Sequence, residues 1–105
     1  MRKIINGKRY DTARAVEVGS ASGGGPVGDF SHWSATMYRT PRSKVYFLHG
    51  EGGPMTRWAV TTGQNEWCGG EDINPMTRDE AFVWAQEHLE PEDVEKEFDD
   101  MIEDA

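Results

Sequence analysis

The sequence predicts an α+β domain, with an antiparallel β-sheet of about four to five strands followed by two C-terminal helices packed on one face. Two observations lead to this expectation. Residues 1–74 contain extended, alternating segments separated by glycine-rich turns. Residues 75–105 contain two helical patterns rich in acidic side chains. Strands followed by helices are typical of α+β architecture, and a chain of 105 residues suits a single domain.

The N-terminal segment predicts a short hairpin. Residues 4–10 form two extended pieces around Asn6-Gly7, a pair that accepts the positive φ angles of a type I′ turn. Residues 15–18 are expected to be extended as well. Residues 19–28 are rich in glycine and predict a surface loop. A phosphate-binding loop is disfavoured there, because the glycine spacing matches neither the Walker nor the dinucleotide pattern.

The strongest predicted hairpin joins residues 33–40 to residues 44–49 through a turn at Pro41-Arg42-Ser43. Its first strand alternates, with Trp33, Ala35 and Met37 on one face and Ser34, Thr36 and Tyr38 on the other. Residues 50–54 end the second strand. Further expectations are a strand at 56–62, a loop at 63–70 and a short edge strand at 72–74, before Pro75.

The first helix is predicted to begin after a capping box. The Thr77 hydroxyl can accept from the Glu80 backbone N–H while the Glu80 side chain accepts from the Thr77 N–H. This helix should run to about Leu89. A second helix should start near Pro91, which suits a first helical position. Its apolar residues form one stripe facing the core, at Val94, Phe98, Met101 and Ile102.

Acidic residues are concentrated in the last third of the chain. Residues 71–105 hold fourteen acids and two bases, residues 1–70 hold nine bases and five acids, and the net charge is −8. Ten acids lie between Glu87 and Asp104. In one continuous helix they would lie along roughly 27 Å, a charge spacing of the same order as that of duplex DNA. Such a surface attracts basic proteins, although a merely solvated helix face explains the composition equally well.

Residues that could bind a metal or act as a nucleophile are few and dispersed. The single cysteine, Cys68, excludes an intrachain disulfide, and no pair of soft ligands has zinc-motif spacing. A metal site assembled from His49, Cys68 and a carboxylate stays open, as does a Cys68–histidine dyad. The simpler interpretation gives these side chains core and strand roles. We therefore expect no cofactor and no enzymatic activity.

The basic residues of the first part offer a nucleic-acid-binding alternative. The candidates on one sheet face are Arg39, Arg42, Lys44, Arg57 and Tyr46. The overall charge of −8 opposes this alternative, and pairing of these bases with the chain's own acidic helices is the simpler interpretation. We expect no direct nucleic-acid partner. We also expect no signal peptide or membrane anchor, because no apolar run approaches about 20 residues.

Three blocks of the chain carry a resemblance. They are residues 5–12 (Ile-Asn-Gly-Lys-Arg-Tyr-Asp-Thr), residues 46–53 (Tyr-Phe-Leu-His-Gly-Glu-Gly-Gly) and residues 80–89 (Glu-Ala-Phe-Val-Trp-Ala-Gln-Glu-His-Leu). In this order they resemble a group of small proteins carried by phages and mobile elements of bacteria, from which this chain departs in its longer glycine-rich loop. The resemblance implies a setting in which small acidic proteins inhibit host defence, as anti-CRISPR proteins do. It carries over no catalytic residue.

The leading hypothesis is an anti-CRISPR protein of the host cytoplasm that binds a Cas effector, with Cas9 favoured, and blocks DNA binding or loading. Cas9-type enzymes hold the guide–target heteroduplex in a positively charged channel that an acidic surface can occupy. The predicted partner-binding residues are Glu90, Glu92, Asp93, Glu95, Glu97, Asp99 and Asp100. The alternative is a phage accessory module that regulates transcription or packaging by binding another protein. The oligomeric state is left open.

Overall fold

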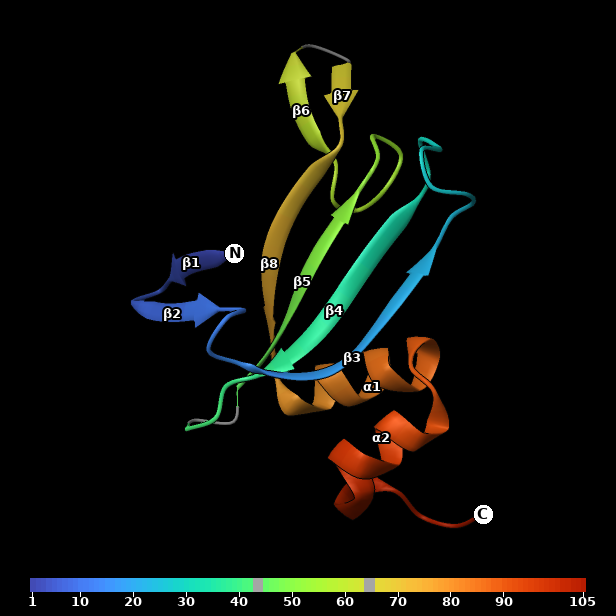
Figure 1. The fold of residues 1–105 in the computed structure, drawn as a ribbon. Coiled ribbons are helices and arrows are strands. Elements are labelled where there is room, and N and C mark those ends of the chain that lie inside the picture. Colours follow the sequence, from blue (N-terminus) through green and yellow to red (C-terminus); the bar gives the residue numbers. More distant parts are fainter. Residues whose placement is uncertain (43–44, 64–65) are drawn as a thin grey trace.

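A four-stranded antiparallel sheet with the strand order β3-β4-β5-β8 forms the centre of the molecule (Figure 1). The computed structural model describes residues 1–42, 45–63 and 66–105. The predicted hairpin of residues 33–49 is confirmed as β4 paired with β5, apart from Ser43 and Lys44, which lie outside the described residues. The sheet strands are β3 (Val16–Gly23), β4 (Trp33–Arg39), β5 (Tyr46–Gly52) and β8 (Gly70–Met76).

Two small hairpins stand apart from this sheet (Figure 1). The first pairs β1 (Arg2–Ile5) with β2 (Lys8–Asp11) and turns at Asn6, whose φ of 51° is the positive value that the sequence predicts. The second pairs β6 (Val60–Gly63) with β7 (Glu66–Cys68) and projects beyond one end of the sheet. The described part of the chain thus has an α+β fold. It contains more β-strands than the four to five that the sequence predicts for the sheet.

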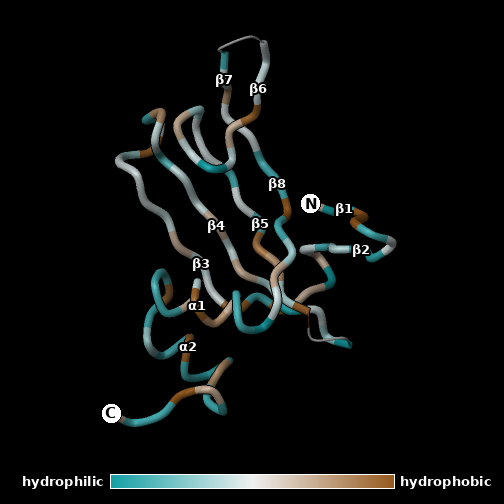
Figure 2. The backbone as a smooth tube through the Cα atoms, turned by 180° about the vertical axis from the view of Figure 1, so that it is seen from behind, coloured by the Kyte–Doolittle hydropathy of each residue, from teal (hydrophilic) through white to brown (hydrophobic). Residues whose placement is uncertain are grey.

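The two predicted helices follow β8 and pack on one face of the sheet. They are α1 (Arg78–His88) and α2 (Pro91–Phe98), and a single 3-10 turn, η1 (Asp99–Met101), comes after them. The capping box is confirmed: the Glu80 N–H donates to Thr77 Oγ1 over 3.1 Å, and the Thr77 N–H donates to Glu80 Oε1 over 2.9 Å. Pro91 occupies the start of α2 as expected. In Figure 2 the helical tube is mostly hydrophilic, with apolar positions at intervals along it.

The main core lies between the helices and one face of the sheet. Met37 and Leu48 of adjacent strands and Phe98 of α2 are completely buried there, which confirms the predicted alternation of β4. A second, smaller core lies on the other face, where the β1–β2 hairpin places Tyr10 against Phe47 with ring centroids 5.4 Å apart. The helices therefore cover one face, and the hairpin covers part of the opposite face.

The loop predicted at residues 19–28 is wrong in its first half, because β3 continues to Gly23. The glycine at position 19 allows close packing and does not mark a flexible loop. A Cβ placed on Gly19 would lie 3.0 Å from both Cδ atoms of Leu89, at the junction of the two helices. The composition of this segment is typical of a loop. In the structure, the absence of a side chain on glycine lets β3 lie close to α2.

The strand predicted at 56–62 is wrong in its first half and confirmed at residues 60–62, and the loop predicted at 63–70 is wrong in most of its described residues. The Thr56 side chain donates to the Gly53 carbonyl over 2.8 Å and accepts from the Trp58 N–H over 3.2 Å, so a turn replaces the first half of that strand. Strand pairing then begins at Val60. Most of the expected loop forms β7 and the start of β8; its residues 64 and 65 lie outside the described residues.

Candidate functional site

Helix α2 carries most of the carboxylates that the sequence predicts as a binding surface. Val94 and Phe98 face the sheet and are buried. Because these two positions fix the rotation of the helix, the remaining positions point to the side or outward. Exposed carboxylates stand at Glu90, Glu92, Glu95 and Asp99, and Asp93 is half-buried.

Glu97 belongs to the interior contacts of the fold. Arg39 Nε on β4 lies 2.9 Å from Glu97 Oε2, and the Tyr46 hydroxyl on β5 donates to the same oxygen over 2.9 Å. Burial, followed by the hydrogen bond to Glu97, raises the pKa of the Tyr46 phenol above its ordinary value. The carboxylate therefore ties α2 to two strands, and it is not available to a partner.

Asp100 is also paired within the chain. The Arg78 guanidinium at the start of α1 donates two hydrogen bonds to its carboxylate, over 2.9 and 2.6 Å. This two-bond geometry is the strong form of an Arg–carboxylate pair, and it holds the pKa of Asp100 below its ordinary value. The guanidinium carbon also lies 5.9 Å from the centroid of the Phe98 ring. Asp100 thus joins η1 to the start of α1.

The acidic stretch is not one continuous helix. It is divided between the end of α1, all of α2, the turn η1 and the non-helical residues 102–105. Ile102, predicted to complete the core stripe, is 38% exposed because the helical register ends at Phe98. The expected line of charges along roughly 27 Å, which assumes one unbroken helix, therefore does not form. Five of the seven predicted residues remain as an acidic group distributed around α2 and its two ends: Glu90, Glu92, Asp93, Glu95 and Asp99, none with an ion-pair partner among the described residues.

An open groove of about 540 Å³ lies between the two helices, beside this acidic group. Its lining combines apolar side chains with the polar groups of Gln86, Glu95 and Glu103. Sequence analysis assigned the apolar positions to the core and so missed this groove. The residues that line it are Phe82, Gln86, Leu89, Pro91, Val94, Glu95, Met101, Ile102 and Glu103. An apolar centre with a charged edge is the usual arrangement of a protein-binding patch.

The possible metal and nucleophile residues do not converge. His49 Nε2 lies 3.0 Å from Glu71 Oε2, a contact between β5 and β8, whereas Cys68 is a half-buried residue of β7. Within residues 1–42, 45–63 and 66–105, no three His, Cys, Asp or Glu side chains stand close enough to hold a metal ion. The other two histidines contact backbone carbonyl oxygens, His32 at Gly25 and His88 at Trp84.

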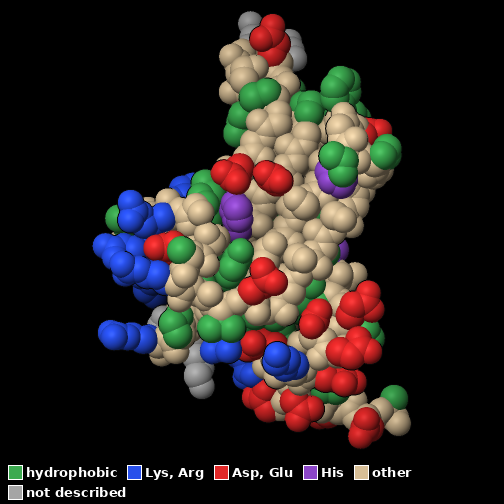
Figure 3. Space-filling view, in the orientation of Figure 1, with side chains coloured by type: hydrophobic (Ala, Val, Ile, Leu, Met, Phe, Trp, Pro, Cys, Tyr) green, Lys and Arg blue, Asp and Glu red, His purple; other side chains and the backbone are tan. Residues whose placement is uncertain are grey.

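The basic residues proposed for nucleic-acid binding do not share one face. Arg39 is held by Glu97, and Tyr46 is buried beside it. Arg57 lies after β5, with its guanidinium 4.8 Å from the centroid of the Trp58 ring. Arg42 follows β4, and Lys44 lies outside the described residues. Figure 3 shows a different grouping: Lys and Arg side chains gather on the N-terminal hairpin, and Asp and Glu side chains cover the helical end.

No protein-family model, curated protein or solved structure matches this chain. Among the helices of the described residues, none is long and apolar enough to cross a membrane.

Proposed function

We propose that the protein is a stoichiometric inhibitor whose helical face docks on a positively charged protein surface. The observation that carries this proposal is the combination of a partly apolar groove of about 540 Å³ with five carboxylates on α2 and its two ends that the fold leaves unpaired. The groove supplies apolar area to bury, and the carboxylates accept charge-assisted hydrogen bonds from Arg and Lys. Neither contribution needs a cofactor or a catalytic group.

The internal ion pairs support a rigid docking face. Glu97 and Asp100 hold α2 and η1 against β4, β5 and α1, so the exposed carboxylates are presented from a fixed backbone. A pre-organised surface loses less conformational freedom on binding than a mobile acidic tail does. The net charge of −8 additionally speeds association with a basic partner at low salt.

The partner that we propose is a Cas effector of the host cytoplasm, with Cas9 favoured, and the protein acts as an anti-CRISPR protein. The resemblance of the three sequence blocks to phage-borne proteins motivates this choice, together with the basic heteroduplex channel of Cas9-type enzymes. Occupation of that channel or of the PAM-reading arginines would prevent DNA binding or loading. The exposed carboxylates lie on α2 and at its two ends and not along one continuous helix. The proposed mechanism is therefore local occupation of a basic site and not imitation of a long duplex.

The experiment that tests this function measures binding to a panel of purified Cas effectors, each offered alone, with guide RNA, and with guide RNA plus target DNA. Stoichiometric binding to the first two forms, loss of binding to the DNA-loaded form and inhibition of target cleavage are the expected results. Equal binding to the DNA-loaded form would contradict competition for the DNA site. No binding to any effector would favour the alternative of a phage accessory module that uses the same face on another basic protein.

A further inference from the structure

A second site lies on the side of the molecule that carries the basic hairpin. The β1–β2 register places Lys3 opposite Tyr10 and Ile4 opposite Arg9. Tyr10 is buried against Phe47, so the hairpin face that contains Tyr10 meets the sheet. The other face points to solvent, because strand residues alternate. Arg9 therefore projects outward.

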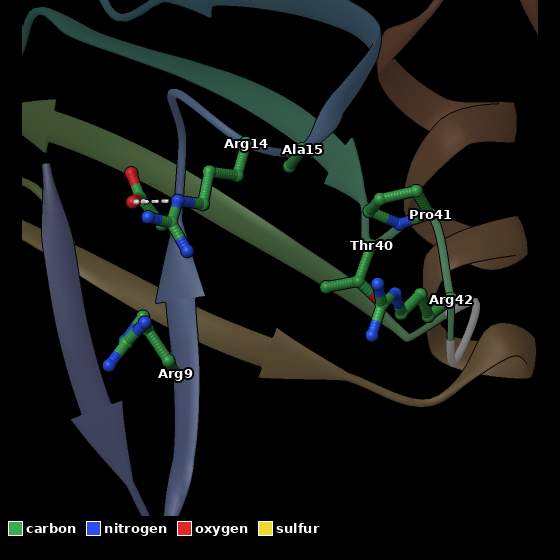
Figure 4. Close-up of a pocket in the computed structure, with 7 residues that line it drawn as sticks. Arg9, Arg14, Ala15, Thr40, Pro41 and Arg42 are labelled. Atoms are coloured by element: carbon green, nitrogen blue, oxygen red, sulfur yellow. Dashed lines mark ion pairs between the residues drawn. The ribbon is translucent and has the colours of Figure 1, made fainter.

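An open pocket of about 470 Å³ separates this hairpin from the turn after β4. Arg9 and Arg14 line it from the hairpin side, and Arg42 lines it from the opposite side (Figure 4). These arginines come from two segments, the end of the hairpin and the turn after β4, which only the folded chain brings together. The apolar part of the wall is formed by Ala15 and Pro41.

The positive charge of this pocket is poorly neutralised by the protein itself. Arg14 Nε lies 3.7 Å from Asp11 Oδ2, and the other oxygen of that carboxylate accepts from the Ala13 N–H over 3.0 Å. Arg9 and Arg42 have no ion-pair partner among the described residues. Guanidinium groups stay charged at every physiological pH. At least two uncompensated positive charges therefore face one concave space.

We propose that this arginine pocket, formed by Arg9, Arg14 and Arg42, binds successive phosphate groups of a nucleic-acid backbone. The planar guanidinium fork matches phosphate oxygens. The positive charge also continues outside the pocket on the same face of the hairpin at Arg2, which has no ion-pair partner among the described residues. A track of this kind suits a polyanion with regularly spaced charges better than a single small anion.

The contact is expected to be independent of base sequence. The tyrosine of the hairpin, Tyr10, is only 6% exposed, and no aromatic side chain is among the residues that line the pocket. Bases therefore have no stacking platform there, and only the backbone phosphates are held. The site lies apart from the helical face, at the opposite side in Figure 3. It goes beyond the proposed inhibitor function, and neither requires the other.

The test measures fluorescence anisotropy of labelled 20-nucleotide single strands and 20-base-pair duplexes, at 50 and 200 mM salt and without any effector. The variant is Arg9→Gln/Arg42→Gln, and its charge-matched control is Arg57→Gln/Lys96→Gln, remote from the pocket. We expect salt-sensitive binding by the parent. The double pocket variant should lose affinity by about tenfold at low salt and reduce the duplex salt slope by about 1.8, or 0.9 for each lost phosphate contact. The control should bind within about twofold of the parent.

Three further arms decide the identity of the ligand. Competition by polyglutamate as effective as that by unlabelled oligonucleotide would overturn the nucleic-acid proposal in favour of an acidic peptide. Pyrophosphate binding as tight as oligonucleotide binding would overturn it in favour of a small phosphate compound. Self-association in sedimentation velocity that Arg9→Gln/Arg42→Gln abolishes would assign the pocket to the acidic face of a second copy. Equal anisotropy curves for parent and variant would remove the pocket as a site, and effector binding is measured separately.

Discussion

The Tyr46 hydroxyl on the central strand β5 donates a hydrogen bond of 2.9 Å to Glu97 Oε2 on α2. Tyr46 is 2% exposed, and its ring centroid lies 5.4 Å from that of Phe98. One residue of the sheet therefore holds the acidic helix twice, by a polar contact to Glu97 and by an aromatic contact one position along. An acidic residue that sequence analysis assigned to partner binding is instead part of the anchor of the helix.

Glu97→Ala should destabilise the protein by roughly 1–3 kcal/mol, because it leaves the Arg39 guanidinium and the buried Tyr46 hydroxyl without their acceptor. Urea unfolding at pH 7 measures this change. The matched control is Glu95→Ala on the same helix, whose exposed carboxylate should alter stability by less than about 0.5 kcal/mol. Equal midpoints for the two variants would show that the Arg39–Glu97–Tyr46 contact contributes no stability.

Stability should fall at alkaline pH through Tyr46. Its pKa is raised in the folded state by burial and by Glu97, so the unfolded chain loses the phenolic proton first as the pH rises. The stability linked to the neutral phenol is complete below the unfolded pKa of about 10 and is lost as the pH rises through the folded pKa. Tyr46→Phe should therefore give a shallower decline of Tm between pH 9 and 11. Burial also raises the pKa of Tyr38, so this residue contributes to the same alkaline loss of stability. Tyr38→Phe is therefore measured alongside to separate the two contributions. Parallel curves for the parent and Tyr46→Phe would contradict the assignment.

Phe98→Ala should cost about 3–5 kcal/mol, because the side chain is completely buried between α1, α2 and the sheet. For a domain of this size, that is a large share of the total stability. Asp99→Ala, one position along and exposed, should leave the melting temperature nearly unchanged. Calorimetry of both variants decides between a packed helix and a loosely attached tail, for which the two melting temperatures would be alike.

Gly50→Val should be strongly destabilising. A Cβ at this position of β5 would overlap the indole of Trp58, which the Thr56 turn lays across the strand. Trp58 is 6% exposed and belongs to the main core, so the ring has little room to move. The near-UV circular dichroism of the tryptophans should weaken together with the loss of stability. Gly28→Val is a control in a loop where an added Cβ meets nothing within 4 Å, although its φ of 95° adds local strain. Equal losses in the two variants would mean that the Trp58 contact is unimportant.

Local signals in the sequence predicted much of this fold, and contacts between distant segments account for the errors. The β4 alternation and the capping box depend on neighbours within a few residues, so their patterns are visible in the sequence. The extension of β3 to Gly23 depends instead on pairing with β4, and Gly19 within it packs against Leu89, about seventy positions away. Composition alone suggested a loop there, because it does not show that a bare backbone is needed for close packing.

The candidate surfaces were predictable only in part for the same reason. The acidity of α2 can be seen in the sequence. The contact that occupies Glu97 cannot, because its partner Arg39 lies 58 positions away in the chain. The arginine pocket requires the hairpin to fold back beside the turn after β4, which brings Arg9 and Arg42 to one cavity. The excess of bases in the first seventy residues was the only available signal for it.

The last prediction concerns the exposed carboxylates alone. Reversal of Glu90, Glu92 and Glu95 to Lys should preserve the fold, since none of the three has an ion-pair partner among the described residues and the buried stripe is untouched. If the helical face binds a basic partner, the association rate should fall by at least about tenfold at low salt, because charges at the edge of an interface act mainly on encounter. Surface-plasmon kinetics at two salt concentrations measure both effects. The charge-matched control reverses Glu17, Glu51 and Glu66, which are exposed on β3, β5 and β7 and do not line the groove. Glu17 lies opposite Tyr38, on the sheet face that the helices do not cover, so the three reversals should leave steering to the helical face largely unchanged. An equal loss in the control would assign the effect to overall charge and not to the helical face. If the affinity of the parent does not change with salt, the binding energy comes mainly from the groove between the helices. Met101 and the 38%-exposed Ile102 are then the residues to replace next.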